Sequence, residues 1–233
     1  IFFKDIIKKK YNLTDIILFS SEPCLFFGIY NMDDYLRLKN YNGLKYVLWG
    51  GSDIDMRFEP ARDIIKKVLE IKGLIHFAIS ESIYKRLENL KIKSTLINFS
   101  LVDQSIYNSS NINYNLNKPN TIYMYDGNKT SNPLIYNKEL IKEIVLKLNN
   151  KYNIIYSSDL CITNDKMIDI YTKCFMGIRL CENDGNANTV QEMGLLGLPV
   201  LHNGLYPNSV PWFNDIDLIC EKIDYIYNNF WNR

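Results

Sequence analysis

The sequence predicts an α/β protein of two domains, each built on a parallel sheet. Along most of the 233 residues, short apolar, β-branched runs alternate with amphipathic stretches of helical period. A polar segment without periodicity, residues 108–120, interrupts this alternation near the middle of the chain. Strand–helix alternation favours parallel sheets, so the pattern indicates one such domain on either side of the segment. We place the domains at residues 1–112 and 113–233.

The first half contains four predicted strands and two predicted helices. Each strand is a short apolar run, and each helix carries apolar residues on one face, with Ser80 as the cap of the second helix. We expect strands at residues 15–19, 45–49, 75–79 and 94–97, and helices at residues 57–71 and through the segment that carries Tyr84, Leu87 and Leu90.

The second half repeats the alternation with four strands and four helices. We expect strands at residues 121–125, 153–157, 175–180 and 199–202, and helices at residues 138–148, 167–172, 189–196 and 215–227. Parallel α/β sheets bind their ligands at the carboxyl ends of the strands. Residues that directly follow these strands are therefore the first candidates for function.

The composition excludes some classes of protein. Charged residues make up 23% and the formal net charge is +1, a balance that argues against a general nucleic-acid binder. No apolar run is long enough to span a membrane, and the first residues lack the apolar core of a signal peptide. The five cysteines form no CxxC pair and no Cys/His cluster has zinc-ligand spacing, so we expect free thiols and a cytoplasmic location.

One strand–loop–helix segment carries the residue types of a phosphate site. The strand at residues 175–180 leads into a loop with Asp184 and Gly185, and the next helix begins near Asn188 or Thr189, either of which can cap it. The N–H groups and the dipole at a helix start favour anions. The sequence therefore predicts that this helix start can bind phosphate.

Two carboxylates flank the predicted helix start. Asp184 lies in the loop, and Glu192 lies one turn inside the helix, where its carboxylate can accept hydrogen bonds from sugar hydroxyls. The small residues Gly185 and Ala187 let a ligand approach the backbone. An ordinary strand–loop–helix turn, with Asp184 solvated and Glu192 on an exposed face, fits the local pattern as well, and both interpretations stay open.

The segment also resembles a known signature. Residues 184–200 read DGNANTVQEMGLLGLPV, with an acid at Asp184, Gly185, a small-residue loop, Glu192 eight positions after the acid, and then Gly-x-Pro-Val. This order resembles the donor-site signature of the family-4-type retaining glycosyltransferases, which have the GT-B fold. Residues 77–107 resemble the segment that closes the first domain of those enzymes.

The resemblance implies a GT-B-like fold and a donor site. It implies two Rossmann-like domains with parallel sheets that face a cleft, with Asn98 and Asp103 nearest to the crossover motif of the family and a short first domain. It also implies transfer from a nucleoside-diphosphate sugar, UDP- or GDP-linked, with retention and without a metal or cofactor. The acceptor, a glycan, lipid or protein, stays unidentified.

The resemblance assigns roles to individual residues. Asp184 would contact the donor sugar, and Arg179 would join it in catalysis by neutralising the leaving diphosphate. Glu192 would hold the ribose hydroxyls. The remaining donor-binding residues would be Gly185, Asn186, Ala187, Asn188, Thr189 and Lys129.

The chain departs from the family in three places. The first acid is Asp184 instead of the usual Glu, and Lys129 is the single cation after the first strand of the second domain. No His follows residues 45–49, where the family often has one. These departures leave open a nucleotide-sugar-binding subunit that needs a partner chain. Arg179 could equally form an ion pair with Asp184 or Glu182.

The segment Gly50-Gly51-Ser52-Asp53 follows a predicted strand and is a second candidate for the cleft. Gly50 and Gly51 let the loop approach a ligand, and Asp53 would face it; the alternative for Asp53 is a cap on the helix that begins near Arg57. Asp53 and Asp55 also form a DxD motif, which holds a divalent metal in GT-A glycosyltransferases. A metal-dependent GT-A enzyme is therefore a further alternative.

The N-terminal segment IFFKDIIKKKY is basic and amphipathic. Such a segment can touch a membrane surface, and it can also form an ordinary surface helix with three exposed lysines. Peripheral membrane contact is therefore an open expectation.

Overall fold

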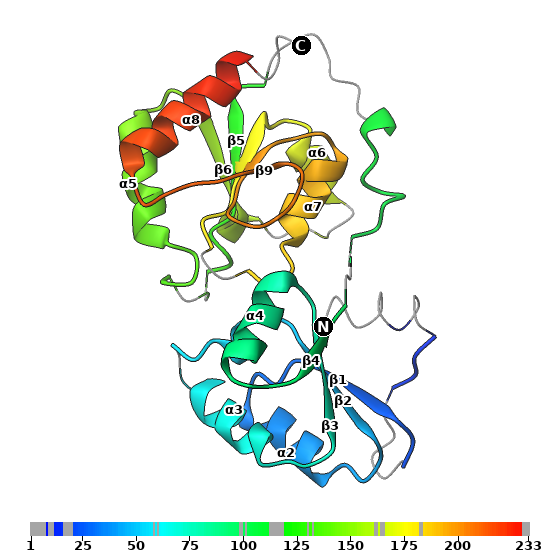
Figure 1. The fold of residues 1–233 in the computed structure, drawn as a ribbon. Helices are drawn as coiled ribbons and strands as arrows, with labels where there is room; N and C mark the ends of the chain where they lie inside the picture. The colour runs from blue at the N-terminus through cyan, green and yellow to red at the C-terminus, as the bar shows by residue number, and fades with distance from the viewer. Residues whose placement is uncertain are drawn as a thin grey trace. The chain divides into compact units, whose positions relative to one another are not determined.

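The strand–helix alternation folds into two separate parallel sheets (Figure 1). The chain divides into a first unit of residues 1–101 with 183–186 and a second unit of residues 102–182 with 187–233. Among the described helices, none is both long and apolar enough to cross a lipid bilayer. The computed structural model describes residues 8, 12–15, 21–57, 59, 61–97, 100, 102–111, 119–129, 131, 133–160, 163, 166–181 and 184–229.

The first unit is a four-stranded parallel sheet in the order β1-β2-β3-β4. Strands that are consecutive in the chain are neighbours in this sheet. Because they are parallel, each connection between them is a crossover that passes through a helix. The elements are β1 (Cys24–Phe27), α2 (Met32–Asn40), β2 (Lys45–Trp49), the short 3₁₀ turn η1 (Ser52–Ile54), α3 (Ala61–Leu69), β3 (Leu74–Ala78), α4 (Glu81–Asn89) and β4 (Ser94–Leu96).

Two helices of this unit begin at side-chain caps. The Asn31 side chain accepts a hydrogen bond from Asp34 N–H at 2.9 Å, and the Asp34 carboxylate accepts one from Tyr30 N–H at 3.1 Å. Ser80 caps α4 by accepting from Ile83 N–H, as the sequence predicts. Such caps satisfy the donors that a helix start leaves unpaired.

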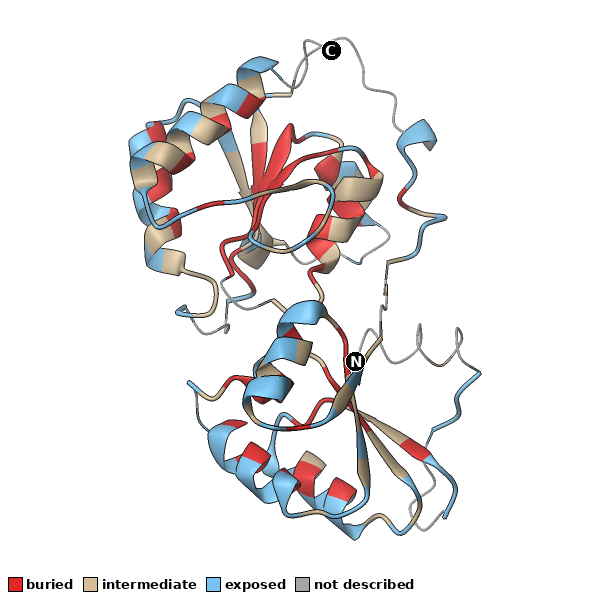
Figure 2. Cartoon of the chain, in the orientation of Figure 1, coloured by how far each residue is buried: buried red, intermediate tan, exposed pale blue. Residues whose placement is uncertain are grey.

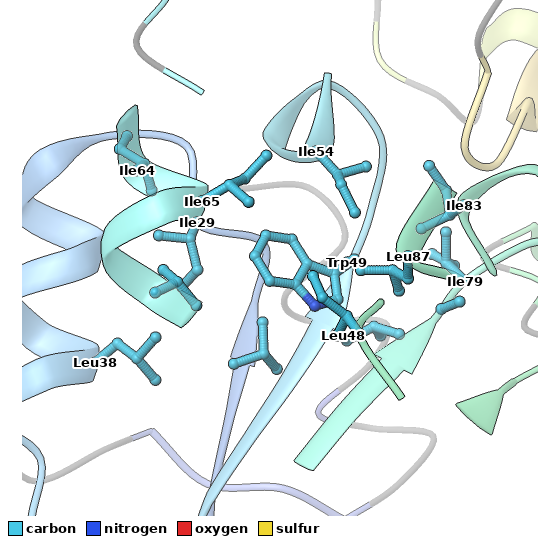
Figure 3. Close-up of a cluster of buried hydrophobic side chains, with 14 of the residues drawn as sticks. Ile29, Leu38, Leu48, Trp49, Ile54, Ile64, Ile65, Ile79, Ile83 and Leu87 are labelled. Carbon is cyan, nitrogen blue, oxygen red and sulfur yellow. The ribbon is translucent and has the colours of Figure 1, made fainter. Parts of the chain in front are cut away.

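The core of the first unit forms around Trp49, whose side chain is fully buried. Figure 3 shows Trp49 among aliphatic side chains from η1 and the helices, including Ile54, Ile65 and Leu87. Its indole N–H is not left unpaired, because it donates to Nδ1 of His76 on β3 at 3.1 Å. This hydrogen bond explains why a histidine lies in an otherwise apolar strand.

The second unit is a five-stranded parallel sheet in the order β6-β5-β7-β8-β9. The chain order reverses between β5 and its two neighbours, which makes the carboxyl ends of β5 and β7 the place where a ligand crevice is expected. The elements are β5 (Thr121–Met124), α5 (Lys138–Leu148), β6 (Asn153–Tyr156), α6 (Met167–Tyr171), β7 (Met176–Ile178), α7 (Asn188–Leu195), β8 (Val200–Leu201), β9 (Ser209–Val210) and α8 (Ile216–Asn229), with 3₁₀ turns η2 (Ser109–Asn111) and η3 (Ser157–Asp159).

Helices cover both faces of this second sheet. Figure 1 shows α5 and α8 on one side and α6 and α7 on the other. Each side has its own apolar cluster: Ile144 and Ile223 belong to the first, and Tyr171 and Met193 to the second. Figure 2 shows the strands between them as mostly buried. This three-layer arrangement is the doubly wound architecture expected from the alternation.

The structure confirms the α/β class with two parallel sheets. It differs from the sequence-based prediction in several elements. The strand β1, the helix α2 and the two-residue strand β9 were not predicted. Helix α3 begins at Ala61 instead of residue 57, because the N–H and guanidinium of Arg57 bind the Asp55 carboxylate in a turn. Residues 16–19 of the predicted first strand, and residues 112–118 of the predicted linker, lie outside the described residues.

Candidate functional site

The start of α7 lies at the carboxyl end of the second sheet, directly after the loop that follows β7. Its N-cap is Ala187, and no side chain caps the helix, so the expected cap by Asn188 or Thr189 is wrong. The Ala187 N–H instead donates to the Tyr206 hydroxyl at 3.1 Å. This hydrogen bond holds the backbone at Ala187, the residue before Asn188. Asn188 and Thr189 therefore lie inside the first turn of the helix.

This helix start carries unsatisfied polar groups. The N–H groups of Asn188 and Thr189 have no acceptor within the helix, because the first turn has no preceding turn. Within the part of the chain that the structure describes, Oδ1 of Asn188 is a buried oxygen without a hydrogen-bond partner. Two donors and one acceptor at a helix N-terminus suit an anion with a neighbouring hydroxyl.

Glu192 lies in the second turn of α7 and is buried, with 7% of its surface exposed. Its Oε2 accepts a hydrogen bond from the Tyr171 hydroxyl at 2.7 Å, and Tyr107 forms a second side-chain hydrogen bond with it. Burial raises the pKa of Glu192, while Tyr171, Arg179 and Tyr107 act to lower it. The carboxylate is thus enclosed by tyrosines, and the expectation that it faces solvent is wrong.

Arg179 directly follows β7 and is buried. Its guanidinium carbon lies 4.0 Å from the ring centre of Tyr125, and Tyr125 in turn packs edge-on against Tyr136 at 5.6 Å. A desolvated cation–π contact of this kind contributes up to about 2 kcal/mol. Arg179 therefore places a fixed positive charge within electrostatic reach of Glu192.

The loop after β5 contains a buried acid instead of a cluster of cations. The Asp126 carboxylate accepts hydrogen bonds from the hydroxyls of Ser157 and Ser158, at 2.9 and 2.7 Å. These bonds join the carboxyl ends of β5 and β6. Lys129, the expected diphosphate cation of this loop, is exposed, and its role stays a prediction.

The acidic loop and the glycine loop belong to the first unit. Asp184, Gly185 and Asn186 are grouped there, as are Gly50 and Gly51. Their positions relative to Arg179 and Glu192 therefore stay predictions. Glu182 and Asn98 lie outside the described residues.

Asp53 has a structural role in its own turn. Its carboxylate accepts hydrogen bonds from the N–H groups of Gly50 and Gly51, the shorter at 2.7 Å, and Gly51 has a φ of +157° that favours glycine. Burial raises the pKa of Asp53 to about 6, against the lowering effect of these bonds. Asp53 therefore clamps the turn after β2, and it does not cap α3 as the alternative proposed.

The Asp55 carboxylate forms an ion pair with Arg57. Its two oxygens accept hydrogen bonds from Nε and Nη2 of Arg57, at 3.0 and 2.8 Å. The two acids of the DxD motif thus make separate local contacts. Among the described residues, no group of three or more His, Cys, Asp or Glu side chains is arranged to hold a metal ion.

Sequence reasoning missed the tyrosines that surround Glu192. Tyr107, Tyr123 and Tyr171 come from three separate segments, and Tyr206 reaches the helix start from the loop before β9. A tyrosine within an apolar run is usually read as core, so no local pattern identified them. The one available signal was the number of tyrosines, 17 in the chain, which does not say which of them meet.

No family model and no curated protein matches the sequence. Several solved structures match its fold. A variant of S. aureus TarM in complex with fondaparinux, alpha-GlcNAc-glycerol and UDP aligns with a TM-score of 0.60 and 11% identity, over 84% of this chain and 47% of that one. This chain therefore spans about half the length of TarM.

Two further structures align over almost the whole chain. Sucrose-phosphate synthase from Thermosynechococcus elongatus gives a TM-score of 0.60 with 11% identity, over 97% of this chain and 67% of that one. A glycosyltransferase from Rickettsia africae gives a TM-score of 0.57 with 17% identity, over 97% of this chain and 70% of that one. At these identities the likeness establishes the fold, and the expected GT-B-like pair of parallel α/β units is confirmed.

Proposed function

We propose that the chain is a glycosyltransferase that binds a nucleoside-diphosphate sugar at the start of α7. The observation that carries the proposal is the start of α7, at the carboxyl end of a doubly wound sheet, where no described side chain caps the helix and no described group binds the buried oxygen of Asn188. The GT-B-like fold supports it, since solved structures with this fold include a glycosyltransferase and a protein in complex with UDP.

The diphosphate would bind at the helix start. The N–H groups of Asn188 and Thr189 would donate to its oxygens, and the positive end of the helix dipole would stabilise its charge. Arg179 would neutralise further charge, with Lys129 as a second, exposed cation. In this proposal Gly185, Asn186 and Ala187 form the loop along which the diphosphate approaches the backbone.

Glu192 would accept hydrogen bonds from the ribose hydroxyls. A carboxylate has about four acceptor positions, and the two tyrosines use two of them. Two acceptor positions therefore stay available for a vicinal diol, which is what a ribose presents. This role requires Glu192 to be ionised, and Arg179 favours that form.

Asp184 would contact the donor sugar. Catalysis would then be electrostatic: the helix start and Arg179 stabilise the leaving diphosphate while an oxocarbenium-like sugar forms. Transfer in this scheme is retaining and needs no metal. The TarM complex, which holds UDP and glycans, makes UDP-sugars and glycan acceptors the first substrates to test.

A nucleotide-sugar-binding subunit is the second candidate. It is favoured by the glycines Gly50 and Gly51, which follow β2 where the resembled family often has a His. The GT-A alternative has less support, because Asp53 and Asp55 are occupied by Gly51 and Arg57. Release of UDP from a UDP-sugar, with or without an added partner chain, separates the enzyme from the subunit.

A nucleoside diphosphate should raise the melting temperature of the protein. At a concentration about 100 times the dissociation constant, the bound ligand adds about 2.7 kcal/mol to the free energy of unfolding. Differential scanning fluorimetry with UDP, GDP, dTDP and ADP in EDTA measures the shift. The matching nucleosides are the control, since the proposed contacts are mainly to the diphosphate and they should shift the melting point less.

Two results would count against this proposal. No shift with any of the four nucleotides would exclude a donor site in this chain. A shift that EDTA abolishes and Mn²⁺ restores would move the site to Asp53 and Asp55.

A further inference from the structure

We propose that Tyr171 is a positioning residue that holds the Glu192 carboxylate ionised and correctly oriented, through the hydrogen bond that its buried hydroxyl donates to this carboxylate. The hydrogen bond is observed in the structure. Its consequence for nucleotide binding rests on the proposed function, so the experiment below tests the two separately.

The side chains around this hydrogen bond come from three elements. Tyr171 ends α6 with 1% of its surface exposed, and its hydroxyl lies 2.7 Å from Oε2 of Glu192 on α7. Tyr123 on β5 packs edge-on against the Tyr171 ring, with ring centres 5.0 Å apart. Tyr123 and Tyr171 both belong to the apolar cluster between the sheet and α6–α7.

The direction of this hydrogen bond follows from chemistry. An ionised carboxylate only accepts, so the Tyr171 hydroxyl donates its single proton to Glu192. Burial, followed by the Glu192 charge, raises the pKa of Tyr171 well above its usual value, so the hydroxyl keeps the proton it donates. The hydrogen bond therefore has one consistent direction while Glu192 is charged.

Three groups favour the charged form of the Glu192 carboxylate. Tyr171 and Tyr107 form hydrogen bonds with it, and Arg179 attracts it. Burial has the opposite effect and the largest one, because it raises the pKa of Glu192. Removal of the Tyr171 hydroxyl takes away a hydrogen bond to the charged form, so the pKa of Glu192 should rise further.

A rise in that pKa has a functional consequence. A protonated Glu192 keeps one O–H donor and fewer acceptor positions, so it can no longer accept from both hydroxyls of a diol. Tyr171→Phe should therefore weaken nucleotide binding most at mildly acidic pH. If Tyr171 acted only through packing, Tyr171→Phe would bind nucleotide with the same pH dependence as the wild type, because the phenylalanine ring keeps the same packing.

The first measurement follows the carboxyl group itself. The ¹³C side-chain resonance of Glu192, assigned with Glu192→Gln, is titrated with pH in the wild type and in Tyr171→Phe. We expect the midpoint to move to higher pH in the variant. The matched control is Tyr152→Phe, which removes a hydrogen bond of the same length, 2.7 Å, from a buried tyrosine to Asp224 elsewhere in the unit.

The second measurement is the affinity for UDP over the same pH range. Tyr171→Phe should bind UDP about threefold to tenfold more weakly at neutral pH, and the ratio to wild type should grow as the pH falls. Tyr152→Phe should leave the affinity and its pH dependence unchanged.

An unchanged Glu192 midpoint in Tyr171→Phe would overturn the positioning role, whatever the affinity does. A shifted midpoint with an affinity ratio that is constant with pH would also overturn it, because charge at Glu192 would then not govern binding. Failure of the wild type to bind any nucleoside diphosphate would reject the proposed function, and the midpoint shift alone would then decide the role of Tyr171.

Discussion

Glu192→Gln should lower the affinity for UDP about tenfold to a hundredfold. The amide keeps the shape of the side chain and one oxygen acceptor, but it loses the charge that strengthens hydrogen bonds to two ribose hydroxyls. The tyrosines that donate to Glu192 in the wild type would also compete with the ribose for the single remaining oxygen. Isothermal titration calorimetry with UDP measures the loss.

The stability of Glu192→Gln should change little, although the side chain is buried. Burial raises the pKa of Glu192, so the neutral amide relieves a desolvation cost while it loses a charge-assisted hydrogen bond from Tyr171. These effects oppose each other, and we expect a change in the free energy of unfolding of about 1 kcal/mol or less. Glu143→Gln, an exposed position on α5, is the matched control. Wild-type affinity in Glu192→Gln would remove Glu192 from the binding site.

Arg179→Gln should weaken binding of UDP about tenfold to a hundredfold and binding of uridine much less, since uridine has no phosphate. The guanidinium is fixed over the Tyr125 ring, so its charge is available to the diphosphate without the cost of ordering a flexible side chain. Its removal also takes a positive charge from beside Glu192, which should raise the pKa of that carboxyl. Calorimetric titration with UDP and uridine separates the phosphate effect from the ribose effect.

A matched control for this variant is Lys222→Gln. Lys222 forms another cation–π contact in the same unit, 5.4 Å from the ring centre of Phe213 on the α8 side. Lys222→Gln should remove this contact without changing the affinity for UDP. An equal loss of UDP and uridine affinity in Arg179→Gln would show that Arg179 supports the fold of the site instead of binding phosphate.

Local patterns predicted the elements that are long or bounded by clear caps. Helix α5 was predicted to the residue, because its apolar residues keep a helical period along its whole length. Helix α2 was missed because its sequence, MDDYLRLKN, is mostly polar and buries only two side chains, Tyr35 and Leu38. Strand β9 has two residues, too few for any alternation to appear.

The candidate site was predictable where it depends on chain order and unpredictable where it depends on packing. The spacing from Asp184 to Glu192 and the helix between them are local, so the sequence shows them. The burial of Glu192 depends on Tyr107, Tyr123 and Tyr171, which lie between 21 and 85 residues away along the chain and meet it through the fold. A carboxylate that one of the two sequence interpretations placed on an exposed helix face is for this reason found among tyrosines.

The central claim, that a nucleoside diphosphate binds at the start of α7, is tested most directly by titrating UDP into isotope-labelled protein and following the backbone amide resonances. We expect saturable shifts of the Asn188 and Thr189 amides, larger than those of amides in α5 or α8, and weaker shifts when uridine replaces UDP. Saturable UDP binding that leaves both amides unperturbed would contradict the claim.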